Sequence, residues 1–197
     1  MSYDKEVKIL TLGNSKVGKS SYIIRYTDDD FNMNINTTIG IDYKYKIETF
    51  EDKKTKVMIY DTNGQERWRS ISFNVLKNAQ GVLLFFDVSD RESFDSIKIW
   101  FESIYQHKDE NFPIVLIGNK IDLPDRAVTK EEGEAEAQKY GKKYFETSCK
   151  DGIGINEPLL HLLSILPKEE NESEQKNRNG SILNTKGDKK KTKKNCC

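Results

Sequence analysis

The sequence predicts an α/β fold, in which a sheet of six strands is covered by helices on both faces. Short apolar runs rich in β-branched residues alternate with longer segments of helical period, which is the pattern of βα units around a parallel sheet. Several of these runs are apolar nearly throughout, as expected of strands that helices cover on both sides. The expected strands are Val7–Leu12, Ile41–Phe50, Lys56–Tyr60, Val82–Asp87, Ile114–Gly118 and Lys143–Glu146.

Three helices can be justified individually. Residues 93–107 carry large apolar side chains three and four positions apart, which places them on one buried stripe. Thr129 and Glu132 form the pattern of a capping box, which begins a helix that runs to Tyr140. A third helix is expected over residues 156–166, with one proline in its first turn and another directly after its end.

One globular domain and a tail are expected from length and composition. The 197 residues suffice for a single domain with an adequate core. The apolar fraction of 36% is low and the charged fraction of 32% is high, which indicates that part of the chain does not pack. We assign residues 1–167 to the domain. Residues 168–197 contain only Ile182 and Leu183 as large aliphatic side chains, so we expect them to form a disordered tail.

The cysteines and the apolar runs argue against two other classes of protein. Three cysteines, two of them at the C-terminal end, cannot form a disulfide framework, and the first residues lack the apolar run of a secretory signal. The longest apolar run, Val82–Phe86, is far shorter than the roughly 20 residues of a membrane-spanning helix. We therefore expect synthesis in the cytosol, with any membrane attachment coming from another source.

The first expected strand is followed by the motif GxxxxGK[ST] and then by a helical stretch. Residues 13–20 read GNSKVGKS, and residues 21–27 continue as a helix. Glycines in such a loop let backbone N–H groups turn toward phosphate oxygens, and the helix N-terminus adds the positive end of its dipole. Lys19 would neutralise the β and γ phosphates of a nucleotide, and the Ser20 hydroxyl would ligate Mg²⁺. The candidate phosphate-binding residues are Gly13, Ser15, Lys16, Val17, Gly18, Lys19, Ser20 and Ser21.

Three further segments argue against the plain alternative, a glycine-rich turn with a solvated lysine. They are Asp61–Glu66 (DTNGQE), Asn119–Asp122 (NKID) and Thr147–Lys150 (TSCK). Their order and spacings resemble those of the Ras-like small GTPases, over about Lys5 to Leu166. The resemblance implies a P-loop NTPase G domain whose mostly parallel sheet contains one antiparallel strand. It also implies GTP or GDP as the ligand and Mg²⁺ as the metal.

The base is expected to be guanine because of Asp122. A carboxylate accepts two hydrogen bonds, so Asp122 can pair with the N1–H and the exocyclic amine of guanine, which adenine does not offer in that arrangement. The resemblance implies that Asn119 links the loop of residues 119–122 to the phosphate loop. It also implies that Lys120 lies along the base. The backbone N–H of Cys149, where the family usually has alanine, would reach the guanine O6. The residues expected to bind the base are Asn119, Lys120, Asp122, Ser148, Cys149 and Lys150.

Two segments resemble the switches of the family. In the first, Thr38 matches the threonine that closes over Mg²⁺ and the γ-phosphate, and Phe31 matches an aromatic that packs edge-on against guanine. A plain core phenylalanine is an equally good interpretation of Phe31 from its type alone. In the second, Asp61 would hold Mg²⁺ through water, the Gly64 N–H would meet the γ-phosphate, and Gln65 would orient the attacking water. The expected metal ligands are Ser20, Thr38 and Asp61, and the expected catalytic residues are Lys19, Thr38 and Gln65.

Turnover of GTP is expected to be slow. No local arginine is obviously placed to stabilise the transferring phosphoryl group, so hydrolysis would depend on a GTPase-activating protein. The resemblance also implies a guanine nucleotide exchange factor. Asn63 stands where the family has alanine, between the aspartate and the glycine of the second switch. Its polar bulk leaves two alternatives open, a slow GTPase or a GTP-binding interaction module with impaired hydrolysis.

Within the small GTPases, the switch segments look like those of the Rab branch. Residues 39–43 (IGIDY) and 67–71 (RWRSI) are similar to Rab signatures. Tyr43 and Tyr60 match two of the three aromatics that Rabs present to switch-binding effectors. Val75–Asn78 replaces the stretch that usually supplies the third, so the identity of the effector is not carried over.

The end of the chain resembles the Rab acceptor for two geranylgeranyl groups. Cys196 and Cys197 are the last two residues, which differs from the C-a-a-X box of Ras and Rho relatives. Two lipid chains make anchoring stable where one is marginal, and each preceding lysine would add roughly 1 kcal/mol against anionic headgroups. The resemblance implies prenylation escort machinery and a GDP-dissociation inhibitor as partners. The expected location is the cytoplasmic face of an intracellular or plasma membrane, with a cytosolic pool.

The expected function is that of a monomeric Rab-type switch, which binds and slowly hydrolyses GTP to regulate vesicle trafficking. Residues 25–31 (RYTDDDF) look most like those of exocytic Rabs. A Ras- or Rho-type signalling GTPase would have the same chemistry and a different anchor. A nucleic-acid-binding protein is ranked last, because the lysine cluster is short and has no interleaved aromatic residues.

Overall fold

The computed structural model describes residues 2–32, 41–62 and 75–167. The chain divides into two units, Met1–Leu166 and Pro167–Cys197, and the fold reported below lies in the first. Within the described ranges, no helix has the length and apolar character that crossing a bilayer requires.

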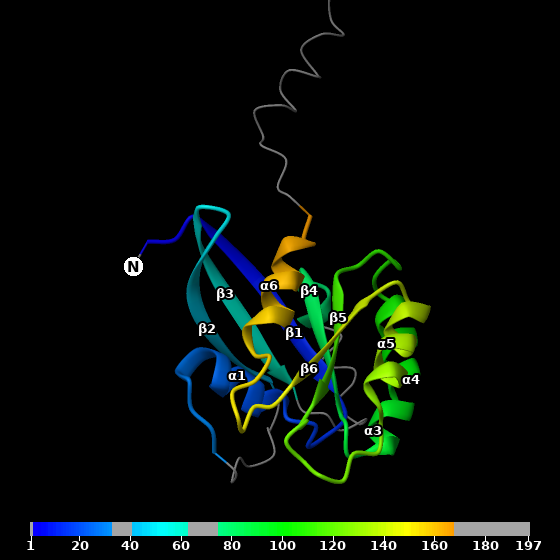
Figure 1. The fold of residues 1–197 in the computed structure, drawn as a ribbon. Helices are drawn as coiled ribbons and strands as arrows, with labels where there is room; N and C mark the ends of the chain where they lie inside the picture. Colours follow the sequence, from blue (N-terminus) through cyan, green and yellow to red (C-terminus); the bar gives the residue numbers. More distant parts are fainter. Residues whose placement is uncertain (1, 33–40, 63–74, 168–197) are drawn as a thin grey trace, which may run out of the picture. The chain divides into compact units, whose positions relative to one another are not determined.

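The strands that form the sheet are β1 (Lys5–Gly13), β2 (Ile41–Phe50), β3 (Lys53–Thr62), β4 (Gly81–Asp87), β5 (Ile114–Asn119) and β6 (Lys143–Thr147). Their order in the sheet is β2-β3-β1-β4-β5-β6 (Figure 1). β2 pairs with β3 antiparallel, and every other pair of neighbours is parallel. The predicted sheet, mostly parallel with one antiparallel strand, is confirmed.

The helices of the described ranges are α1 (Lys19–Asp28), α3 (Arg91–Asp95), α4 (Ile97–Tyr105), α5 (Lys130–Lys139) and α6 (Asn156–Ser164). Figure 1 shows α1 and α6 on one face of the sheet and α3, α4 and α5 on the other. Both faces of the central strands are therefore covered, as the apolar character of those strands predicts.

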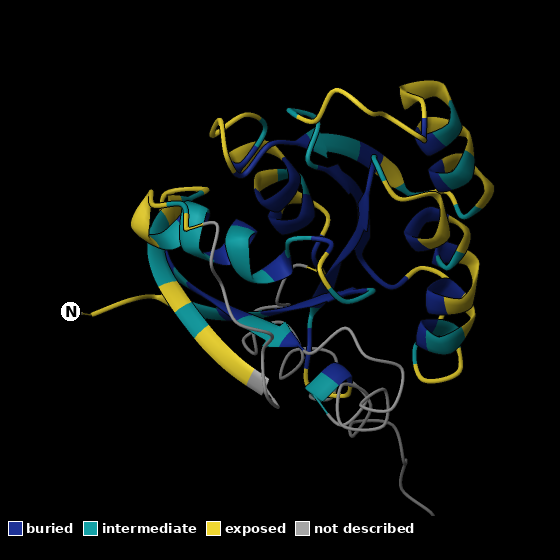
Figure 2. Cartoon of the chain, turned by 90° about the horizontal axis from the view of Figure 1, so that it is seen from below, coloured by how far each residue is buried: buried dark blue, intermediate teal, exposed yellow. Residues whose placement is uncertain are grey.

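Strand β4 contributes side chains to both hydrophobic clusters, one on each face of the sheet. All of its residues are buried. Figure 2 shows buried strands lying between the helices of the two faces. Val82, Leu84 and Phe86 pack into the cluster under α4, whereas Leu83 and Phe85 pack into the cluster under α1 and α6. Because successive side chains of a strand point to opposite faces, a continuous apolar run is what a two-sided core requires.

The predicted helix over residues 93–107 is divided into α3 and α4. The first piece begins earlier than predicted, because the Asp90 side chain accepts hydrogen bonds from the N–H groups of Glu92 and Ser93. The division falls at Ser96, whose hydroxyl donates to the Glu92 carbonyl at 2.8 Å. Such a bond back to the preceding turn bends helices, and the apolar periodicity carries no sign of it.

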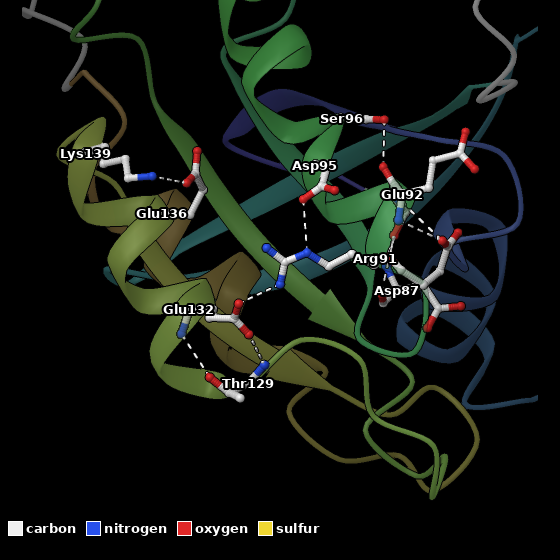
Figure 3. A network of polar contacts seen from close by, with 11 residues as sticks. Asp87, Arg91, Glu92, Asp95, Ser96, Thr129, Glu132, Glu136 and Lys139 are labelled. Carbon is white, nitrogen blue, oxygen red and sulfur yellow. Dashed lines mark hydrogen bonds and ion pairs between the residues drawn. The ribbon is translucent and has the colours of Figure 1, made fainter.

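The predicted capping box of α5 is confirmed. The N–H of Glu132 donates to the Thr129 hydroxyl at 3.2 Å, and the Thr129 N–H donates to the Glu132 carboxylate at 2.8 Å. The same carboxylate accepts from Arg91, which also pairs with Asp95 within α3 (Figure 3). Arg91 thus links α3 to the start of α5 on the face of the sheet that these helices cover.

Candidate functional site

The carboxyl ends of the parallel strands bring the predicted motifs to one edge of the sheet. Gly13 ends β1, Asn119 ends β5 and Thr147 ends β6. The register places Asp87, the last residue of β4, beside Asn119, and Asn119 beside Thr147. In open α/β sheets this edge is where ligands bind, so the candidate site has the position that the topology demands.

The phosphate loop, residues 13–20, depends on two glycines for close packing. Gly13 has φ +134° and Gly18 has φ +100°, conformations that L side chains rarely adopt. A Cβ on Gly13 would lie 2.2 Å from the Phe85 carbonyl oxygen, and one on Gly18 would lie 2.1 Å from Asn119 Nδ2. Glycine therefore lets the phosphate loop pack closely against both β4 and the last residue of β5.

Lys19 lies inside the phosphate loop, where it is buried. Its ammonium donates to the carbonyl of Gly13 at 3.0 Å and to that of Asn14 at 2.7 Å. Burial lowers the pKa of Lys19 to about 8, and attraction to Asp61 offsets only part of this shift. The Lys19 ammonium is therefore already positioned in the loop, where it can bind the phosphate of a ligand.

Ser20 and Asp61 come together from opposite sides of the site. The Ser20 hydroxyl at the start of α1 donates to Asp61 Oδ2 near the end of β3, at 2.6 Å. A hydroxyl and a carboxylate are the hard oxygen donors that Mg²⁺ prefers, so this pair fits the expected metal. Of the other predicted phosphate-binding residues, Val17 is buried, Ser15 and Ser21 are half-buried and Lys16 is exposed.

Asn119 connects the phosphate loop with the guanine loop, which we define as residues 147–151. Its Nδ2 donates to the Val17 carbonyl at 2.9 Å. Its Oδ1 accepts from the Thr147 hydroxyl at 2.9 Å and from the Cys149 thiol at 3.3 Å. All of these groups are buried, so the bonds are shielded from competing water. The bond to Val17 is the contact that the resemblance implies between Asn119 and the phosphate loop, whereas the bonds to Thr147 and Cys149 were not predicted.

Cys149 departs from the usual alanine of the family, and the structure accommodates it. The side chain is buried against the core under α1 and α6, and the thiol donates to Asn119. Burial raises the pKa of Cys149 to about 12, so the thiol stays neutral at physiological pH. The substitution adds a hydrogen bond to the junction of the loops and leaves the main-chain N–H of Cys149 in place.

Asp122 and Lys120 are each held by a second residue. The Ser148 hydroxyl donates to Asp122 Oδ1 at 2.7 Å. Lys120 has φ +69°, a strained value for a residue with a side chain, and its ammonium pairs with Asp87 at 2.6 Å. Lys150, the last predicted base-binding residue, is exposed. The bond between Ser148 and Asp122 thus joins the guanine loop to the loop after β5, and the pair of Lys120 with Asp87 joins that second loop to the end of β4.

Three predicted aromatic and effector positions lie within the described residues. Phe31 is half-buried and packs against the core under α1 and α6. Tyr43 is 52% exposed, and its ring centroid lies 5.7 Å from that of Tyr60 on the neighbouring strand. Leu76, in the stretch that replaces the third aromatic, is fully buried. Of the matched effector aromatics, the exposed Tyr43 and the half-buried Tyr60 therefore lie side by side on β2 and β3.

Several predicted site residues lie outside the described residues. They are Thr38 of the first switch, Asn63, Gly64 and Gln65 of the second switch, and the terminal pair Cys196 and Cys197.

Two supporting contacts were not predicted from the sequence. Asp87 pairs with Lys120, and its place at the end of β4 was the available signal, because the ends of parallel strands converge. Asn14 of the phosphate loop donates to Ser96 at 3.0 Å and accepts from the Trp100 indole at 2.9 Å. No motif marks this second link, which joins residues that lie more than 80 positions apart.

Comparisons with known proteins identify relatives of the chain. A model of the Ras family matches residues 8–168 of the chain. Ras-related protein SEC4 of Saccharomyces cerevisiae is 36% identical over an alignment that covers 100% of this chain and 93% of SEC4. GTP-binding protein ypt2 of Schizosaccharomyces pombe is 39% identical and covers 100% of this chain and 98% of its own length.

A human relative extends the comparison beyond fungi. Ras-related protein Rab-3D of Homo sapiens is 38% identical over 87% of this chain and 79% of Rab-3D. The chain belongs to the Rab branch of the Ras family of small GTPases, and it binds GTP and GDP and hydrolyses GTP.

Proposed function

We propose that the carboxyl edge of the sheet holds GTP between the phosphate loop and the guanine loop, with Asn119 as the connection between them. The observation that carries this proposal is the bond from Asn119 Nδ2 to the Val17 carbonyl, at 2.9 Å. One side chain thereby fixes the distance between a phosphate-binding loop and a base-binding loop. Asp122 would accept from N1–H and the exocyclic amine of guanine, and the Cys149 N–H would donate to O6.

The phosphate end of the proposed site is built from charges that are already positioned. Lys19 would exchange its two carbonyl partners for β and γ phosphate oxygens, which are stronger acceptors. Ser20, Thr38 and Asp61 would hold Mg²⁺, Asp61 through water. When bound, the metal supplies positive charge that neutralises the phosphate oxygens. Main-chain N–H groups at the start of α1 would complete the cradle.

For hydrolysis, we assign Gln65 to orient the attacking water and the Gly64 N–H to bind the γ-phosphate. Thr38 would close the first switch over the same phosphate. These side chains and main-chain groups position the reactants and stabilise charge, because little covalent chemistry is required of the protein in phosphoryl transfer. Asn63 directly precedes Gly64 in the sequence, where the family has alanine, and we expect slow intrinsic hydrolysis that an activating partner accelerates.

Single-turnover phosphate release from GTP-loaded protein tests this assignment. Slow release is expected from the wild type, with a loss of at least about a hundredfold in Gln65→Leu, because leucine cannot orient water. Asn63→Ala is the matched variant next to it, and it is expected to release phosphate at least as fast as the wild type. No release from the wild type together with restored release in Asn63→Ala would instead support an interaction module that does not hydrolyse GTP.

Regulation of vesicle trafficking, in an exocytic step, is the cellular function that we propose. Rab relatives imply an exchange factor, an activating protein, a GDP-dissociation inhibitor and effectors as classes of partner. The exposed Tyr43 ring beside Tyr60 is the surface we assign to effectors, since paired aromatic rings supply contact area at low entropic cost.

Membrane attachment is proposed to come from geranylgeranyl groups on Cys196 and Cys197, added with the help of escort machinery and supported by the lysines before them. The cytoplasmic face of an intracellular or plasma membrane is the proposed location, with a cytosolic pool. Fractionation of cells that express the Cys196→Ser, Cys197→Ser double variant is expected to find it in the cytosol, and recovery of that variant with membranes would contradict the proposal.

A further inference from the structure

Arg25 lies in the last turn of α1, and its side chain reaches the guanine loop rather than solvent. Only 17% of the side chain is exposed. We propose that Arg25 is a positioning residue for base recognition, which holds the guanine loop and Phe31 in the orientation that guanine requires. The inference rests on the guanine site proposed above and adds a residue that no motif of that site contains.

The first part of the argument is the bond of Arg25 to two successive carbonyls. Its Nε donates to the Cys149 carbonyl at 2.7 Å, and its Nη2 donates to the Lys150 carbonyl at 3.0 Å. The guanidinium is planar and presents its donors in a rigid fork, so it fixes the directions of both carbonyls together. Bonds from a charged donor are stronger than neutral ones. A lysine in this place has no such fork.

The second part follows from the planarity of the peptide bond. In a trans peptide the C=O and the next N–H point in opposite directions. When Arg25 holds the Lys150 carbonyl, the Asp151 N–H faces the other way, and there it donates to the Ser148 hydroxyl at 3.0 Å. That hydroxyl donates to Asp122 at 2.7 Å. Arg25 thus orients the hydroxyl that in turn holds the base-reading carboxylate.

The third part of the argument concerns Nη1, the remaining nitrogen of the Arg25 guanidinium. Nη1 donates to the Asp29 carbonyl at 3.0 Å, where the chain leaves α1 with a φ of +52°. The guanidinium carbon lies 5.9 Å from the centroid of the Phe31 ring, within reach of a cation–π contact. The Asp29 carboxylate itself is 95% exposed, so its ion pair with Arg25 adds little. Arg25 therefore joins the guanine loop with the expected aromatic edge of the base pocket.

A purely structural role is the competing explanation, and the guanine loop has its own support. Ser148 and Ile153 exchange two backbone hydrogen bonds, at 2.9 and 3.0 Å. The side chain of Asn119 holds the start of the loop through Thr147 and Cys149. Loss of Arg25 is therefore expected to leave the loop folded and to release the orientation of its carbonyls, which affects base recognition more than stability.

The test compares GDP with 6-thio-GDP, in which a sulfur that accepts hydrogen bonds weakly replaces O6, and with IDP, which lacks the exocyclic amine. Dissociation constants are measured by displacement of fluorescent GDP from the wild type, Arg25→Met, Arg25→Lys and Arg91→Met. Arg91→Met is the matched control, because it removes an arginine that bonds to Asp95 and Glu132 on the outer layer of the fold (Figure 3). Thermal unfolding of all four proteins reports their stability.

In the wild type, 6-thio-GDP and IDP are each expected to bind at least about tenfold more weakly than GDP. Arg25→Met is expected to weaken GDP by about tenfold to a hundredfold and to reduce the IDP penalty to less than about threefold, because a Ser148 hydroxyl that is free to turn no longer holds Asp122 toward the exocyclic amine. Arg25→Lys should behave similarly, and Arg91→Met should keep both penalties.

Each contrary result has a defined meaning. Unchanged penalties in Arg25→Met and Arg25→Lys, beside clear penalties in the wild type, would overturn the inference about Arg25 and leave the guanine site standing. Absence of both penalties in the wild type would overturn the proposed guanine site and the inference with it. A fall in GDP affinity with the same fold-change for all three nucleotides would assign Arg25 a structural role and overturn the inference.

Discussion

Asp122→Asn is expected to change the base preference from guanine to xanthine. The new amide keeps one acceptor but places a donor where the carboxylate accepted from the exocyclic amine of guanine, so two donors then oppose each other. Xanthine has a carbonyl at that position and restores the pairing. Affinity for GTP should fall by about ten-thousandfold, since a site built for hydrogen bonds rejects a mismatched analogue strongly, and affinity for XTP should rise.

Ser148 makes this expected result sharper. Its hydroxyl donates to Asp122 Oδ1, so it favours the oxygen of the new amide at that position and leaves the nitrogen at the position of Oδ2. Competition of GTP and XTP against fluorescent GDP measures the change. Asp125→Asn is the matched control, because Asp125 is exposed on the same loop and should keep the guanine preference. If Asp122→Asn still preferred GTP to XTP, the assignment of Asp122 to the base would be wrong.

Lys19→Met is expected to weaken binding of GTP and GDP by at least about a thousandfold. The substitution removes a buried, charged donor from the phosphates and keeps a side chain of similar length. Lys16→Met is the matched control, since Lys16 is exposed and is assigned to the phosphates only through the main chain of the loop. Its loss of affinity should stay below about tenfold. Equal losses in the two variants would contradict the role of Lys19.

The depressed pKa of Lys19 adds a pH dependence to the same prediction. In the free protein the pKa is about 8, and phosphates bound to the ammonium would raise it. Binding therefore takes up a proton when the pH exceeds the pKa of the free site. Affinity for GDP is expected to be constant below about pH 8 and to fall toward about tenfold per pH unit above it. Calorimetry in buffers of different ionisation enthalpy measures the proton uptake, and equal heats would contradict it.

The positions of the strands along the chain could be predicted from the sequence because their apolar runs are nearly continuous. β4 and β5 are buried along their whole length, and only strands covered on both faces carry such runs. The capping box at Thr129 could also be predicted from the sequence, because its hydrogen bonds join residues only three positions apart. Strand ends were predicted less well: β3 is longer at both ends than predicted, since its outer residues pair with β2 although they are polar.

The parts that could not be predicted depend on contacts between distant residues. The division between α3 and α4 at Ser96 coincides with a bond from Asn14 of the phosphate loop. The pairing of Asp87 with Lys120 follows from strand order, which no local pattern contains. The contacts of Arg25 with Cys149 and Lys150 have no signature in the sequence. Motifs thus indicated the groups that we propose to meet the nucleotide, and the fold showed which residues hold those groups.

The central claim is that Asn119 joins a phosphate loop to a loop that reads guanine, and equilibrium competition on the wild-type protein tests it most directly. GTP and ATP are titrated in separate experiments against bound fluorescent GDP. The two nucleotides share the same phosphates, so any difference between them reports the base. GTP is expected to compete at least about ten-thousandfold better than ATP. Competition by ATP within about tenfold of GTP would contradict the account.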